Sequence, residues 1–253
     1  MLIYKFIKKL IPVKIKKIIK SIIQNYKLVS HEDYMKTVEA YYSNLIETDG
    51  LNYEILVNGV NAIKGVQGII CEIGTRRGGS AKWIIDTLVN NKDTDRTFVT
   101  IDPYGNVEYD HGDGDVGSRK EVVGDFTNKM RSETIPYLYH YGLNKLSNFI
   151  FFNLEDSEFF ERYKDGIPTY SEEKKEIVNQ YSLVFFDGPH DYKSVYKEVE
   201  FFNDRTPVGA VYIFDDVSGS YNHDLLENKL LLDFGWTRLD TSERKISYKK
   251  MII

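Results

Sequence analysis

The stretch that decides the fold is Gly68-Ile-Ile-Cys-Glu-Ile-Gly-Thr-Arg-Arg-Gly-Gly-Ser80, in which a short apolar run leads into a glycine-rich turn. The run is rich in β-branched residues, which predicts a strand buried on both faces. An amphipathic stretch at residues 79–90 then predicts a helix. The glycines let a ligand approach the backbone, and the helix start offers free N–H groups. The spacing matches neither the G-x-G-x-x-G of dinucleotide binders nor a P-loop, and a tight turn without a ligand is the alternative.

The alternation of apolar runs and helical patterns continues along the chain. Further runs predict strands at residues 97–101, 148–152, 183–186 and 210–214, and helical patterns occupy residues 31–65, 155–164, 191–203 and 221–232. Residues 236–240 and 245–252 predict two more strands, which a short link makes antiparallel. We therefore predict a Rossmann-like, doubly wound α/β fold. Its seven-stranded sheet is mostly parallel and ends in an antiparallel C-terminal hairpin.

The formal net charge of −5 hides a split between the two ends of the chain. Residues 1–30 contain eight lysines and no acidic residue, so the remainder carries 25 basic and 38 acidic side chains. We expect a basic arm at residues 1–30 and one domain at residues 31–253, with a long insertion at residues 104–147. The insertion is placed to cover a ligand, with a solvated acidic loop as the alternative. The acidic body argues against nucleic-acid binding, and the single Cys71 excludes a disulfide framework and points to a reducing compartment.

The arm has the pattern of a basic amphipathic helix. Apolar residues recur at helical spacing in residues 1–24, interrupted at Pro12, and lysines fill the other face. No uncharged run approaches the roughly 18 residues of a membrane span, and no secretory signal is present. Such a helix suits an anionic membrane surface, while packing on its own domain or in a homodimer is the alternative. We expect a cytoplasmic protein with either peripheral contact at the inner face of the membrane or a protein contact through residues 1–24.

Acidic residues end two neighbouring predicted strands, Glu72 at the first and Asp102 at the second. A carboxylate at the second strand tip can accept both hydroxyls of a ribose. The set formed by Glu72, Gly74, the glycines before Ser80 and Asp102 resembles the cofactor site of class I S-adenosylmethionine-dependent methyltransferases. That resemblance implies that Asp102 binds the ribose, that the turn binds the methionyl end, and that the segment ending in Asp156 and Ser157 borders the adenine. The implied cofactor residues are Glu72, Gly74, Thr75, Gly78, Gly79, Ser80, Asp102, Asp156 and Ser157.

A second acidic set follows the fourth and fifth predicted strands. The fourth ends in Asp187-Gly-Pro-His190, and the fifth ends in Asp215-Asp216. Parallel strand tips meet at one edge of a sheet, where like charges repel unless a cation compensates them. Carboxylates suit Mg²⁺, with Mn²⁺ or Ca²⁺ as alternatives, and His190 could remove a proton from an acceptor. The competing interpretation is that these residues cap the following helices.

This second set resembles the metal-dependent sugar O-methyltransferases of the macrocin and mycinamicin type. The matching segments are Asp187-Gly-Pro-His190-Asp-Tyr192 and Phe214-Asp215-Asp216. The resemblance implies Asp187, Asp215 and Asp216 as metal ligands and His190 or Asp187 as the catalytic base. We therefore expect methyl transfer to a sugar hydroxyl, in a nucleotide sugar or a surface-glycan precursor of the kind used for polysaccharide or capsule biosynthesis. The alternatives are a phosphorylated small-molecule acceptor, a nicotinamide-dependent oxidoreductase, and a non-catalytic membrane-associated binding module.

Overall fold

The computed structural model describes residues 36, 46, 50–104, 108–110, 120–122, 128–170, 174–189, 191–217 and 223–251. The chain forms two compact units, Met1–Ala40 and Tyr41–Ile253, and every element named below belongs to the second. The predictions for the basic arm and for His190 fall outside the described residues, so both stay predictions. Within the described residues, no helix has the length and apolar character needed to cross a membrane.

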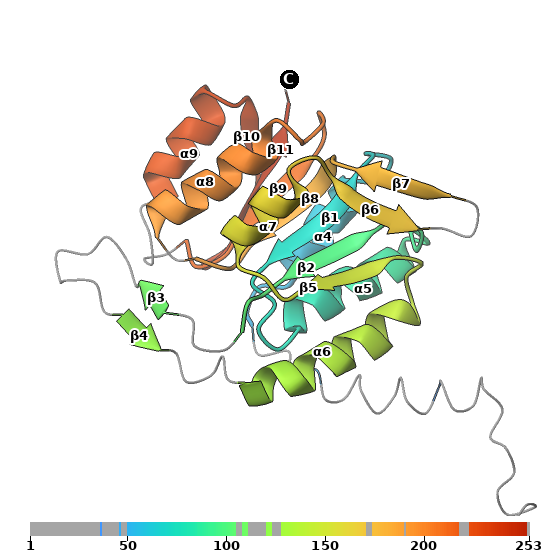
Figure 1. Ribbon diagram of the computed structural model, residues 1–253. Coiled ribbons are helices and arrows are strands. Elements are labelled where there is room, and N and C mark those ends of the chain that lie inside the picture. Colours follow the sequence, from blue (N-terminus) through green and yellow to red (C-terminus); the bar gives the residue numbers. More distant parts are fainter. Residues whose placement is uncertain are drawn as a thin grey trace, which may run out of the picture. The chain divides into compact units, whose positions relative to one another are not determined.

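A seven-stranded sheet in the order β10-β11-β9-β8-β1-β2-β5 forms the centre of the larger unit (Figure 1). Its strands are β1 (Ile69–Ile73), β2 (Phe98–Ile101), β5 (Phe149–Phe152), β8 (Tyr181–Phe186), β9 (Val211–Phe214), β10 (Trp236–Thr241) and β11 (Ile246–Lys250). Strand β11 pairs antiparallel with both β9 and β10, and the other neighbours in the sheet pair in parallel. The predicted fold, with its antiparallel C-terminal hairpin, is confirmed.

Helices cover both faces of this sheet, as Figure 1 shows. On one face α4 (Glu54–Ala62), α5 (Gly79–Asn90) and α6 (Asn128–Leu143) enclose an apolar core, and on the other α7 (Asp156–Tyr163), α8 (Tyr192–Asn203) and α9 (His223–Leu232) enclose a second one. Successive strand residues point to opposite faces, so Leu183 and Phe185 enter the first core whereas Val184 and Phe186 enter the second. Because both faces are buried, the parallel strands β1, β2, β8 and β9 are mainly apolar, as the sequence indicated, whereas most residues of β10 are exposed.

Two small hairpins lie outside the main sheet. The first consists of β3 (Glu108–Asp110) and β4 (Lys120–Val122), and it belongs to the insertion predicted at residues 104–147. The second consists of β6 (Ile167–Tyr170) and β7 (Lys175–Val178), which the apolar periodicity did not indicate. Three of the four residues of β7 are exposed, so this strand lacks the apolar run that marks a buried one.

Strand β1 marks the point where the chain reverses its direction of growth across the sheet. From β1 the chain adds β2 and β5 on one side, and β8 and β9 follow on the other. In open α/β sheets, ligands bind at the carboxyl ends of the strands at such a switch point. The fold therefore places the candidate site at the tips of β1, β2, β8 and β9.

Candidate active site

The tips of the parallel strands are held side by side by backbone hydrogen bonds. The amide of Asp102 donates to Phe152, that of Gly74 to Ile101, that of Asp187 to Ile73 and that of Asp215 to Phe186, at 2.9–3.0 Å. Each bond joins the residue that follows one strand to the last residue of its neighbour. The structure therefore brings the acids predicted from four separate segments to one edge of the sheet.

Glu72 lies inside this edge, fully buried at the end of β1. Its carboxylate accepts hydrogen bonds from the hydroxyl of Ser80 at 2.5 Å and from that of Thr100 at 2.6 Å. Burial raises the pKa of Glu72 to about 7, although both hydroxyl bonds act in the opposite direction. Glu72 thus ties the first residues of α5 to the ends of β1 and β2, beneath the glycine-rich turn.

Gly74 lets the tips of β1 and β8 touch. Its φ is +88°, and a Cβ built there would lie 2.0 Å from the carbonyl oxygen of Asp187. Only glycine fits this position, because another residue would be strained in φ and would collide with backbone. The contact places Asp187 directly beside the glycine-rich turn.

A helix of the insertion, α6, packs against the glycine-rich turn. Gly78, at φ +84°, precedes α5, and a Cβ on it would lie 2.7 Å from a methyl group of Leu138 in α6. Leu138 is fully buried. The helical part of the insertion therefore packs behind the turn, on the face that α5 also covers.

The carboxylate of Asp102 accepts hydrogen bonds from backbone amides of the glycine-rich turn. One carboxylate oxygen accepts from the amides of Thr75 at 3.0 Å and Arg76 at 2.8 Å, and the other accepts from the amide of Tyr104 at 3.0 Å. Both Arg76 and Tyr104 have positive φ, at 45° and 48°. Burial raises the pKa of Asp102 to about 6 despite these three donors. A carboxylate offers about four acceptor positions, so the ribose role of Asp102 stays a prediction beside this observed structural one.

The segment predicted to border the adenine starts α7. Asp156 is the first residue of the helix and Ser157 is exposed, while Glu155 and Glu158 form a capping box around them. Asp156 lies close to the buried carboxyl of Glu198 in α8, whose pKa is raised well above its ordinary value by burial and then by this neighbour. Asn153 donates to the carbonyl oxygen of Asp102 at 2.9 Å, which joins this segment to the proposed ribose position.

Asp187 and Asp215 follow neighbouring strands at this edge, and two basic side chains contact Asp215 and Asp216. The ammonium of Lys245 donates to Asp215 at 2.8 Å, and the guanidinium of Arg244 bonds to Asp216 and lies 3.9 Å from Asp215. Asp187 is partly exposed, and burial followed by the charge of Asp215 raises its pKa well above the ordinary value. Residues 244 and 245 had been assigned only to the link and strand of the C-terminal hairpin, so the sequence interpretation missed them.

The predicted metal site can be tested against these contacts. The prediction rested on three carboxylates that needed a cation, whereas Lys245 and Arg244 already compensate two of them. Among the residues that the structure describes, no three His, Cys, Asp or Glu side chains form a group suited to a metal ion. The carboxylates therefore do not fit the ligand set that was predicted, and no step below is assigned to a metal.

Comparison with known proteins identifies the family. A family model described as a methyltransferase domain matches residues 71–217, which is more than half of the 253-residue chain. The chain belongs to this methyltransferase family. The match begins in β1 and ends directly after Asp215 and Asp216, so it contains every predicted site residue. The prediction of a class I S-adenosylmethionine-dependent methyltransferase is confirmed.

Solved structures share the fold of this methyltransferase. The O-methyltransferase NovP aligns with a TM-score of 0.55 at 19% identity over 79% of each chain. The calicheamicin methyltransferase CalS11 aligns at 0.50 and 14% identity, over 87% of this chain and 93% of its own. A putative O-methyltransferase from Klebsiella pneumoniae aligns at 0.51 and 12% identity, over 86% and 90%. No curated protein matches the sequence closely enough to be counted as a relative.

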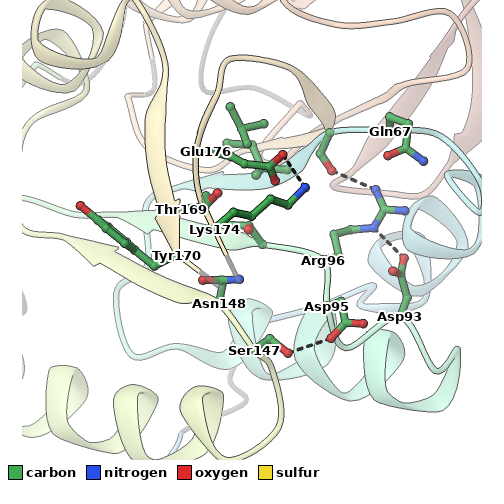
Figure 2. Close-up of a pocket in the computed structure, with 14 residues that line it drawn as sticks. Gln67, Asp93, Asp95, Arg96, Ser147, Asn148, Thr169, Tyr170, Lys174 and Glu176 are labelled. Atoms are coloured by element: carbon green, nitrogen blue, oxygen red, sulfur yellow. Dashed lines mark hydrogen bonds and ion pairs between the residues drawn. The ribbon is translucent and has the colours of Figure 1, made fainter. Parts of the chain in front are cut away.

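A cavity of about 910 Å³ lies at the opposite edge of the methyltransferase sheet. Its lining comes from the segments before β1, β2 and β5 and from the β6–β7 hairpin. Figure 2 shows its polar groups paired with one another, Arg96 with Asp93, Lys174 with Glu176 and Ser147 with Asp95. It contains none of the predicted site residues, so we place the active site at the carboxyl ends of the strands, where the acids converge.

Proposed function

We propose that this protein transfers a methyl group from S-adenosylmethionine to a hydroxyl oxygen, and that the hydroxyl belongs to a sugar. The close approach of Gly74 to the backbone carbonyl of Asp187 carries the proposal, because it brings Asp187, the residue proposed for the acceptor side, next to the proposed cofactor turn. The sugar is supported by the resemblance of residues 187–192 and 214–216 to sugar O-methyltransferases. NovP, a structure with the same fold, is named an O-methyltransferase.

The chemistry of the strand tips fits the cofactor. S-adenosylmethionine supplies a methyl group bound to a positively charged sulfur, which makes that methyl open to attack by oxygen. Glu72, Asp102 and Asp187 lie at the ends of three adjacent strands, and a sulfonium bound beside them would favour their ionised forms. The backbone of the turn from Gly74 to Ser80 would hold the methionyl end at the start of α5. Asp102 would hold the ribose, and Asp156 and Ser157 would border the adenine.

The acceptor hydroxyl needs a group that takes its proton. Asp187 is proposed for this role, because it follows β8 directly beside the turn and is partly exposed. His190, the other predicted base, lies outside the described residues. Proximity contributes much of the rate, since the protein holds hydroxyl and methyl in attack geometry. The predicted divalent cation is not part of this proposal, because Asp215 and Asp216 already have basic partners.

The test is a screen for S-adenosylhomocysteine release with nucleotide sugars and phosphorylated metabolites as acceptors. We expect release with at least one nucleotide sugar, and about 100-fold less with Asp187→Asn, because loss of a general base typically lowers the rate by at least this factor. Binding of S-adenosylmethionine, measured by calorimetry, should be retained in the variant. Tight binding of NAD without binding of S-adenosylmethionine would contradict the proposal.

A further inference from the structure

The reversed direction of β11 brings basic residues to the acidic edge of the sheet. Strand β11 runs antiparallel to β9, with Ile246 opposite Phe214. The start of β11 therefore lies beside the end of β9, and the amide of Val217 donates to the carbonyl of Arg244 at 3.1 Å. Every other strand of the sheet begins at the opposite edge. Arg244 and Lys245 thus reach Asp215 and Asp216 because of strand direction.

Lys245 is built into the core of this edge. It is 1% exposed, and its ammonium donates to Asp215 at 2.8 Å and to the carbonyl oxygen of Leu51 at 2.8 Å. The ammonium also lies 5.9 Å from the ring centres of Tyr53 and Phe185. A buried ammonium is retained only where charge and hydrogen bonds compensate it. Asp215, itself 8% exposed, provides that charge.

Arg244 forms the second ion pair of this edge, and its side chain is partly exposed. Its side chain is 38% exposed, bonds to Asp216, and has its Nε 3.9 Å from Asp215. Asp216 has a φ of 52°, in the left-handed region that Asp adopts more readily than most residues. Three carboxylates are thus matched by two cations from the chain. The third carboxyl group is that of Asp187, the residue beside the glycine-rich turn.

We infer that Lys245 and Arg244 are the counter-cations of the acceptor site and take the place that the family resemblance gave to a divalent metal. The inference rests on the proposed function. With Asp215 and Asp216 neutralised, the acceptor O–H bond would break and its proton would pass to the carboxylate of Asp187. The oxygen would bond to the methyl carbon of S-adenosylmethionine as the carbon–sulfur bond breaks, and neutral S-adenosylhomocysteine would leave. Lys245 acts through Asp215 and is a positioning residue. Methyl transfer then needs no added metal.

Direct metal binding tests the inference without any acceptor. The purified full-length protein is titrated with Mn²⁺, and free Mn²⁺ is followed by electron paramagnetic resonance. We expect no binding that depends on Asp216, so wild type and Asp216→Asn should give the same curve. One Mn²⁺ per chain that binds to wild type and is lost in Asp216→Asn would overturn the inference. This result does not depend on whether the proposed function is correct.

Turnover gives the second test, with the acceptor found in the screen. Wild-type kcat should change less than about twofold in EDTA, whereas Lys245→Met should lower kcat about 100-fold with little change in acceptor KM, since preorganised charge acts on the chemical step. Lys245→Arg should restore part of the loss. Loss of activity in EDTA that Mg²⁺ restores, or full kcat in Lys245→Met, would overturn the inference. No turnover with any acceptor would count against the proposed function alone.

Lys250→Met is the matched control for folding. Lys250 lies at the other end of β11, is 5% exposed, and donates to the carbonyl oxygen of Asn203 at 2.6 Å. Both variants remove a buried ammonium, from the residue before β11 or from the last residue of β11, but only Lys245 lies at the acidic edge. We expect Lys250→Met to lower the melting temperature and keep kcat. An equal loss of kcat in both variants would mean that Lys245 is merely structural.

Discussion

At the residue scale, buried acids dominate the properties of the site. Glu72 and Asp102 are nearly inaccessible to water, and burial raises both pKa values, to about 7 and about 6. A raised carboxyl pKa means that the folded state binds a proton more tightly than the unfolded state. Stability is therefore highest while both groups are protonated, and ionisation of the buried carboxyls works against the fold.

The pH dependence of stability should show this effect at Glu72. The folded pKa of about 7 lies above the unfolded value of 4.5, so the contribution of Glu72 is full below 4.5 and is lost as pH rises to 7. Glu72→Gln, which cannot ionise, should remove this loss, on the order of 1–3 kcal/mol between these pH values. Urea unfolding of wild type and variant across pH 4.5–7.5 measures it. Parallel curves would show that Glu72 does not titrate in this range.

Gly74 provides a second test at the same scale. Gly74→Ala combines positive φ with a Cβ 2.0 Å from the Asp187 carbonyl oxygen, and we expect a loss on the order of 4 kcal/mol in unfolding free energy. Gly65 is the matched control, since its φ is +79° and nothing lies within 4 Å of its Cβ position. Gly65→Ala should cost about 1–2 kcal/mol, from φ strain alone. Equal losses by chemical denaturation would argue against the close approach of β1 and β8.

At the element scale, α6 connects the insertion to the cofactor turn. The helix contains Pro136 and has buried and exposed apolar residues, of which Leu138 contacts the Gly78 position. The sequence indicated an insertion at residues 104–147 that is placed to cover a ligand, but gave no sign of which face of the sheet its residues would cover. The structure shows that α6 packs on the same core as α5, so part of the insertion supports the site from behind.

Leu138→Ala should weaken both the fold and the cofactor site. Removing this buried side chain costs about 2–5 kcal/mol, and the space left behind Gly78 should loosen the turn and raise the Kd for S-adenosylmethionine. Leu143, in the same helix but 54% exposed, is the control, and Leu143→Ala should stay within about 0.5 kcal/mol. Calorimetric binding and thermal unfolding provide the readouts. Unchanged binding in Leu138→Ala would separate α6 from the cofactor site.

At the second core, His223 and Cys71 are buried. His223, close in sequence to Asp216, bonds through Nε2 to the Tyr248 hydroxyl at 2.8 Å and is 5% exposed. Burial lowers its pKa to about 4, so the ring stays neutral. Cys71 is likewise fully buried in β1. Both residues belong to the packing of the core.

At the scale of the whole molecule, the charge is divided between a basic arm at residues 1–30 and an acidic remainder. We propose that residues 1–24 hold the acidic methyltransferase unit at an anionic membrane surface, because lysines alternate there with apolar residues. Removing residues 1–24 should abolish co-sedimentation with vesicles that contain phosphatidylglycerol, and high salt should weaken it in the full chain. Vesicles of phosphatidylcholine alone are the control. Equal binding by both proteins would exclude the membrane role.

The sequence by itself determined the sheet, the turn and the acids at the strand tips. Each of these depends on neighbours in the chain, since burial on two faces produces a continuous apolar run and close backbone contact requires glycine. Glu72, Asp102, Asp187, Asp215 and Asp216 could be placed at one edge because parallel strands end together. The same reasoning could not reveal charges contributed by an antiparallel strand.

Only the tertiary structure decided how those acids are compensated. Lys245 lies 30 residues from Asp215, and their contact depends on β11 entering the sheet in the reverse direction. Asp102 likewise accepts hydrogen bonds from amides of the turn, which lie in a distant segment. Leu138 packs behind Gly78, which is also distant in the sequence. A periodic pattern records whether a residue is buried, but it does not record its partner. The partner is set by strand order and direction, and at this edge the partners of Asp215 and Asp216 are Lys245 and Arg244.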